Sequence, residues 1–169
     1  MRGWKILPVA VVTGLLVLTA PVWAKSIVVK SETPIVTVNV PYGFESSGID
    51  HGVETKTPDE GILVWVEVVP AADLDALLKE HDAYWQSQGV DLGGAPAHVN
   101  QEVDGKKVAA TDFKSATWKG EPTVIRYLLI DPALQSKNVI VLSMWASPEA
   151  DKAHDADVNK MISSLDVKE

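Results

Sequence analysis

Residues 62–69, ILVWVEVV, form the most strand-like stretch of this chain, because only one of their eight side chains is polar. Two later stretches have the same character: residues 123–130 (TVIRYLLI) and 138–146 (NVIVLSMWA). Strands that are apolar at nearly every position are usually covered on both faces and lie at the centre of a sheet. The three stretches therefore predict the central strands of one sheet.

Shorter β-branched segments, separated by turns, predict the other strands. Asp104-Gly105 suits a tight type I′ turn, so its flanking segments are expected to form a hairpin. Pro and Gly favour turns, and we expect turns at 41–44, 58–61 and 119–122 and loops at 90–97 and 131–137. The remaining expected strands are 26–32, 35–40, a weak one at 49–55, and the hairpin strands 99–103 and 107–118.

Two helices are predicted from apolar residues at three- and four-residue steps. The first spans residues 73–88, with Asp73 as N-cap, Gly89 as C-terminal stop and an apolar stripe that includes His81. The second begins at Ser147-Pro148-Glu149, a typical helix start. No strand–helix–strand alternation recurs, so a parallel sheet is not expected. The predicted class is α+β, an antiparallel sheet with helices packed on it. The two stripes are Leu74, Leu77, Leu78, His81 and Trp85, and then Ala150, His154, Val158, Met161, Ile162 and Leu165.

Residues 1–24 have the layout of a secretory signal peptide. A basic start is followed by an apolar run over residues 6–20, and Val22 and Ala24 provide compact residues for cleavage between Ala24 and Lys25. The apolar run is shorter than the roughly 20 residues of a membrane-spanning helix. We therefore expect residues 25–169 to form a single exported domain, periplasmic or secreted, with no membrane anchor after processing.

Charge and composition exclude several functions. Without Arg2 and Lys5 the expected mature chain keeps 13 basic and 23 acidic residues, a formal charge of −10. Such a chain is repelled by nucleic acid phosphates and by anionic lipid surfaces. Because the chain has no cysteine, thiol redox chemistry, cysteine nucleophiles, thiolate metal sites and a lipidated Cys are excluded.

The order of the expected elements resembles that of the PsbP/Mog/DcrB-like superfamily. A strand pair leads into Val40-Pro41-Tyr42-Gly43-Phe44, and a strand–turn–strand, a helix, a long hairpin, two strands and a final helix ending Ile162-Ser163-Ser164-Leu165 follow. The exported bacterial DcrB-type branch is the most similar. The resemblance implies an α/β/α sandwich around an antiparallel sheet, in proteins that mostly bind or assemble rather than catalyse. It implies no shared catalytic residues.

Alternation along the three central strands suggests one candidate binding surface. If the strand sides that contain polar residues line up, a single sheet face combines aromatic and apolar side chains with a few converging polar groups. Such a face is typical of a ligand or peptide site, and it should then be open to solvent. The alternative is a cross-strand ion pair on a face half covered by a helix. The candidate residues are Trp65, Glu67, Arg126, Leu128, Ser143 and Trp145.

No catalytic or metal-binding motif is complete. Asp155-x-Asp157-x-Asn159 resembles the start of a calcium loop, but Lys160 replaces the required Gly, so an exposed acidic helix face is favoured. The four histidines lack metal-ligand spacing, and no cofactor motif is present. Ser46-Ser47 lies near Asp50 and His51 without a nucleophile elbow, so a polar turn is favoured there. We expect no metal and no cofactor.

Three functions follow in order of preference. The first is an exported, non-catalytic binding or assembly module that acts on an envelope protein or an apolar segment. The second is a carrier of a small apolar ligand or lipid, which requires an enclosed cavity. The third is a hydrolase centred near His51 or His98, which requires a cleft that joins a histidine to a carboxylate and a hydroxyl.

Overall fold

The computed structural model describes residues 24–130 and 137–169. The predicted signal peptide up to Trp23 and most of the predicted loop at 131–137 lie outside the described residues. None of the helices within the described ranges is long and apolar enough to cross a membrane.

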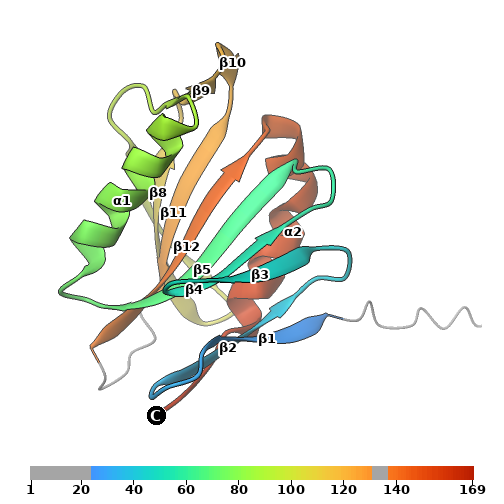
Figure 1. Ribbon diagram of the computed structural model, residues 1–169, viewed down its shortest axis with the longest axis vertical. Coiled ribbons are helices and arrows are strands. Elements are labelled where there is room, and N and C mark those ends of the chain that lie inside the picture. The colour runs from blue at the N-terminus through green and yellow to red at the C-terminus, as the bar shows by residue number, and fades with distance from the viewer. Residues whose placement is uncertain (1–23, 131–136) are drawn as a thin grey trace, which may run out of the picture.

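A seven-stranded antiparallel sheet forms the centre of the structure (Figure 1). The three strands predicted to be central are adjacent in its middle, with two further strands on each side. This arrangement confirms the predicted α+β class with an antiparallel sheet. In spatial order the strands are β3 (Glu45–Ile49), β4 (Gly52–Lys56), β5 (Ile62–Pro70), β12 (Asn138–Ala146), β11 (Val124–Ile130), β8 (Lys106–Phe113) and β7 (Ala97–Val103).

Two small sheets flank the main one. One contains β1 (Lys25–Lys30), β2 (Ile35–Val40) and β13 (Asp166–Lys168), and β13 was not predicted. The other joins β6 (Val90–Asp91), β9 (Thr117–Trp118) and β10 (Glu121–Pro122).

Both predicted helices are present, as α1 (Leu74–Ser87) and α2 (Pro148–Ser164). The hydroxyl of Ser147 accepts a hydrogen bond from the Ala150 amide at 3.1 Å, which caps α2 as predicted. Asp73 precedes α1, but its side chain makes no capping hydrogen bond. Gly89 follows α1 with φ +84°, a conformation that favours glycine at a helix end.

Two predicted strands had wrong limits. The weak strand at 49–55 is a hairpin that turns at Asp50-His51, and Ser46-Ser47 is part of β3, because its backbone pairs with Thr55 and Glu54 of β4. The strand expected at 107–118 ends at Phe113, where a turn buries Ala116 and sends Thr117–Trp118 to another sheet. The Asp104-Gly105 turn has φ of 50° and 78°, as a type I′ turn requires.

The two helices lie on opposite faces of the main sheet (Figure 1). We call these the α1 face and the α2 face. The α1 face carries an aromatic cluster that includes Trp65, Trp85 and Tyr127. The α2 face carries the larger aliphatic core, in which α2 and the β1–β2–β13 sheet pack on Val64, Leu142 and their neighbours. Because both faces are covered, the central strands are apolar at nearly every position.

Candidate functional site

The register of the strands divides the predicted binding residues between the two faces. Ser143 lies opposite both Trp65 and Tyr127, so Trp65, Glu67, Ser143 and Trp145 share the α1 face. Arg126 lies opposite Met144, and Leu128 opposite Leu142, which places both on the α2 face. The prediction of one shared face was therefore wrong, since a one-residue shift in pairing moves a strand's side chains to the other face.

The α1 face is closed, contrary to the expectation that it would be open. The exposed fractions of Trp65, Glu67 and Ser143 are 8%, 3% and 0%. Helix α1 covers them, and Trp85 stacks on Trp65 with ring centroids 4.6 Å apart. A stacked pair of buried aromatic rings adds to the area-dependent stabilisation of a core. The aromatic side chains of this face therefore hold α1 on the sheet.

A polar cluster lies under α1, formed by Ser143, His81 and Glu67 from three different elements. The Nδ1 atom of His81 is 2.7 Å from the Ser143 hydroxyl. Its Nε2 atom is 2.9 Å from a carboxylate oxygen of Glu67. A hydrolytic triad also has a histidine between a hydroxyl and a carboxylate, but there Nε2 faces the hydroxyl and Nδ1 the carboxylate, the reverse of the contacts of His81. All three side chains are buried, however, so a substrate has no path to the hydroxyl.

Helix α1 makes a second polar contact with the sheet, partly buried, through Asp82. The Tyr127 hydroxyl donates a hydrogen bond to Asp82 at 2.6 Å. Burial, the hydrogen bond with Asp82 and the charge of Asp82 all raise the pKa of Tyr127 above its ordinary value. The phenol therefore remains neutral at physiological pH. Together with His81, this contact fixes the orientation of α1 on the sheet.

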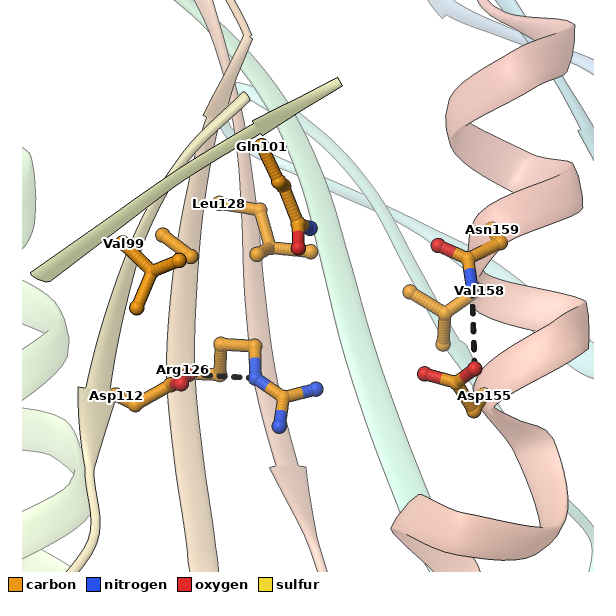
Figure 2. Close-up of a pocket in the computed structure, with 9 residues that line it drawn as sticks. Val99, Gln101, Asp112, Arg126, Leu128, Asp155, Val158 and Asn159 are labelled. Carbon is orange, nitrogen blue, oxygen red and sulfur yellow. Dashed lines mark hydrogen bonds and ion pairs between the residues drawn. The ribbon is translucent and has the colours of Figure 1, made fainter. Parts of the chain in front are cut away.

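A groove opens on the α2 face, between the strands β7, β8 and β11 and helix α2 (Figure 2). Its volume is about 190 Å³. Two predicted residues, Arg126 and Leu128, line it. Its apolar lining residues are Val99, Ala110, Leu128 and Val158, and its polar ones are Gln101, Asp112, Arg126, Asp155 and Asn159.

Arg126 links the sheet to α2 at this groove. Its Nε donates to Asp112 on β8 at 2.6 Å, and its Nη1 donates to Asp151 on α2 at 3.1 Å. Burial opposes the charged form, but the two carboxylates outweigh it, so the net effect is a raised pKa of Arg126. The positive charge of the guanidinium is therefore balanced by the chain's own carboxylates.

Asp155 is the exposed acid of the groove. Its carboxylate accepts a hydrogen bond from the Asn159 amide at 3.1 Å (Figure 2). Among residues 24–130 and 137–169 it has no cationic partner. Since Arg126 is balanced by Asp112 and Asp151, Asp155 leaves the groove with a net negative charge.

The other candidate residues are dispersed. His51 is exposed in the β3–β4 turn, and the exposed His98 has its Nδ1 3.0 Å from the Thr111 hydroxyl. Asp155 and Asn159 lie on helix α2, which agrees with an acidic helix face. Within the described part of the chain, no group of three or more His, Asp or Glu is arranged to hold a metal ion.

Sequence reasoning missed the role of His81. It placed His81 on the apolar stripe of α1 but did not connect it with Glu67 and Ser143. One feature of the sequence indicates such a role. His81 lies in the middle of an apolar helix stripe, and a buried histidine needs a polar partner, which the isolated polar residues of the central strands can provide. The pairing of the three required the register, which the sequence does not give.

Comparison with known proteins supports the fold. No protein-family model matches the sequence, and no curated protein matches it. The solution structure of cyanobacterial PsbP (CyanoP) from Synechocystis sp. PCC 6803 is similar, with a TM-score of 0.58 and 7% identity over 92% of this chain and 98% of that chain. LpqN, involved in cell envelope biogenesis of Mycobacterium tuberculosis, has a TM-score of 0.53 and 8% identity over 86% and 91% of the two chains.

A third similar structure is the Ran-binding protein Mog1p of Saccharomyces cerevisiae, with a TM-score of 0.49 and 14% identity over 85% of this chain and 95% of that chain. The likenesses to PsbP and LpqN confirm the fold that the resemblance implied, that of the PsbP/Mog/DcrB-like superfamily. At these identities they show the fold alone.

Proposed function

We propose that this protein is an exported, non-catalytic binding module that holds an envelope protein in the groove on its α2 face. The observation that carries the proposal is the contrast between the two sheet faces. The hydroxyl, histidine and carboxylate that catalysis would need are buried under α1, whereas the α2 face has an open groove with apolar walls and an exposed acid that has no cationic partner among the described residues. Apolar walls with a few polar groups are typical of a recognition site.

Export is part of the proposal. The layout of residues 1–24 supports it, and so does the fold shared with LpqN, a protein involved in cell envelope biogenesis. The proposed mature form begins at Lys25, after cleavage behind Ala24.

The size of the groove favours a protein partner over a small apolar ligand or lipid. Pockets that enclose small ligands usually measure roughly 300–1,000 Å³, whereas this groove measures about 190 Å³. A space of that size accommodates side chains of a larger partner, which can remain outside the groove. The carrier function is therefore the weaker alternative.

Site-specific photocrosslinking in intact cells tests the proposal. A photoreactive residue replaces Asn159 at the groove or, as the matched control, the exposed Gln86 on α1. We expect a discrete crosslinked polypeptide from position 159 that is absent from position 86 and that disappears when Asp155→Lys is added. Crosslinks from position 86 alone would contradict the proposal. So would crosslinks from both positions that are unchanged by Asp155→Lys.

A further inference from the structure

The outer edge of β7 lies directly beside the groove and, among residues 24–130 and 137–169, has no pairing strand. β7 is the last strand of the seven-stranded sheet on that side, and Val99 and Gln101 reach from it into the groove (Figure 2). Val99 is 45% exposed. An unpaired edge presents a row of backbone donors and acceptors to solvent.

β7 lacks three of the devices that protect edge strands, namely Lys, Pro and β-bulges. Its sequence, AHVNQEV, contains neither Lys nor Pro, and its pairing with β8 runs over seven residues without a shift. The other edge of the same sheet, β3, is shorter and contains Gly48. In the β1–β2–β13 sheet, the edge strand β1 begins and ends with Lys, and its pairing with β2 has a register shift. β7 is thus the edge left most open to pairing.

The hairpin turn defines which backbone groups of β7 face outward. Asp104-Gly105 is a two-residue type I′ turn, so the flanking pair, Val103 and Lys106, exchanges hydrogen bonds. In an antiparallel pair, hydrogen-bonded and non-hydrogen-bonded residues alternate. The outward N–H and C=O groups are therefore those of His98, Asn100 and Glu102.

We propose that the partner binds as an extended segment that adds a strand to the outer edge of β7. The inference rests on the proposed function and specifies its partner. Backbone groups of the segment pair with those of His98, Asn100 and Glu102, and every second side chain of the segment lies beside Val99 and Gln101, over the groove. Strand addition of this kind obtains affinity from backbone hydrogen bonds and specificity from alternate side chains.

The groove selects the chemistry of those alternate side chains. Val99, Leu128 and Val158 provide apolar contact, and Asp155 provides an uncompensated negative charge. A Lys or Arg side chain suits both the apolar surface and the negative charge, because the aliphatic part of the side chain packs on apolar surface while the charged end remains solvated. The preferred segment therefore alternates basic and apolar residues with small polar ones. The acidic chain, with a formal charge of −8, attracts such a segment.

The same charge disfavours a second copy of this chain as the occupant. Two copies paired through β7 would bring two grooves of net negative charge together, and like charges across an interface are destabilising. A dimer that depends on β7 is therefore an outcome that would overturn the inference.

The test uses synthetic heptapeptides and the variant Asn100→Pro, with Asn100→Thr as the matched control. Proline removes the outward N–H at position 100 and leaves the bonds to β8, since an edge strand tolerates proline where the N–H faces solvent. Threonine keeps the N–H. The probe peptide alternates threonine with lysine, valine and lysine, and a second peptide has glutamate in place of both lysines.

Binding is followed by NMR titration of the ¹⁵N-labelled mature protein. We expect shifts at the amides of His98, Asn100 and Glu102 with the lysine peptide. Asn100→Pro should weaken this binding about tenfold, the effect of losing roughly one to two hydrogen bonds, whereas Asn100→Thr should leave it unchanged. Asp155→Asn should lower the affinity for the lysine peptide about threefold, which brings it closer to the affinity for the glutamate peptide.

Three results would overturn the inference: equal binding by Asn100→Pro and Asn100→Thr, shifts confined to residues away from β7, or a concentration-dependent dimer that Asn100→Pro abolishes. Failure of this inference can be distinguished from failure of the proposed function. If position 159 still crosslinks the partner while the proline variant binds as the threonine variant does, the groove remains the binding site and strand addition is wrong.

Discussion

The α1 face and the α2 face of the central sheet contain similar kinds of residues and differ in what covers them. Both combine apolar side chains with a few polar groups. On the α1 face, α1 lies directly on the sheet and encloses Glu67, His81 and Ser143. On the α2 face, α2 and β7 leave a groove between them, and Asp155 at its side is exposed. Polar groups that contact one another under a helix stabilise structure, whereas those along an open groove are available to a partner.

The largest loss of stability is expected from a substitution in the polar cluster under α1. His81→Ala removes the group that contacts both Glu67 and Ser143 and leaves two buried polar side chains without it. Leaving a buried polar group without a partner costs about 1–3 kcal/mol, so with two such groups the free energy of unfolding in urea should fall by about 2–4 kcal/mol. As a control, combining Glu67→Leu, His81→Phe and Ser143→Ala should recover most of the loss. A loss below about 1 kcal/mol in His81→Ala would contradict a structural role for the cluster.

A smaller effect is expected at the link between the sheet and α2. Arg126→Met leaves Asp112 and Asp151 close together without their shared cation. Because these side chains are partly exposed, we expect a loss of about 1–2 kcal/mol of unfolding free energy. Arg126→Lys should retain part of this stability, since it keeps the charge but not the planar fork. Equal stability of the wild type and Arg126→Met would show that Arg126 does not hold α2.

Alkaline pH gives a test of the enclosure of Tyr127. Its pKa in the folded state is raised above the ordinary value of 10.0. Stability from the neutral phenol is therefore fully present below about pH 10 and is lost as pH rises toward the folded pKa. Between pH 9 and pH 11 we expect Tyr127 to lower the free energy of unfolding by about 1 kcal/mol, measured by urea unfolding.

Tyr127→Phe should remove that part of the pH dependence. Tyr42→Phe is the matched control, because Tyr42 is 83% exposed, and it should keep the wild-type slope. If Tyr127→Phe and the wild type decline in parallel, the phenol is not sealed under α1.

The smallest effect on stability is expected at the groove. Asn159→Lys changes a partly exposed side chain on α2 that donates a hydrogen bond to Asp155. Surface substitutions of this kind usually stay within about 0.5 kcal/mol, so the unfolding free energy should be almost unchanged, while crosslinking of the partner by a photoreactive residue at position 101, also in the groove, should be lost. A loss above 2 kcal/mol would assign the groove residues to the core.

The sequence predicted the sheet more fully than the site, for physical reasons that particular residues illustrate. Residues 62–69, 123–130 and 138–146 are strands because their side chains must be buried on both faces, and local patterns are sufficient to detect that. Asp104-Gly105 predicted its hairpin because the turn requires positive φ. The β13 strand was missed because three residues carry too little periodicity.

The site depends on register, which local patterns do not define. Arg126 and Leu128 were assigned to the same face as Trp65, although the pairing of β11 with β12 places them opposite Met144 and Leu142. When both faces of a strand are apolar, alternation does not distinguish them, and the partner strand decides which side chains meet. The association of His81 with Ser143 spans 62 residues of chain and follows from tertiary packing alone.

Thiol labelling tests the central claim most directly, because the chain has no cysteine of its own. Ser143→Cys, Gln101→Cys and Gln86→Cys place single thiols under α1, at the groove and on the outer side of α1. We predict that Ser143→Cys reacts with a maleimide only as fast as the protein unfolds, whereas Gln101→Cys reacts at once and becomes protected in cells that contain the partner. Rapid labelling of Ser143→Cys, or partner protection at Gln86→Cys and not at Gln101→Cys, would contradict the assignment of the two faces.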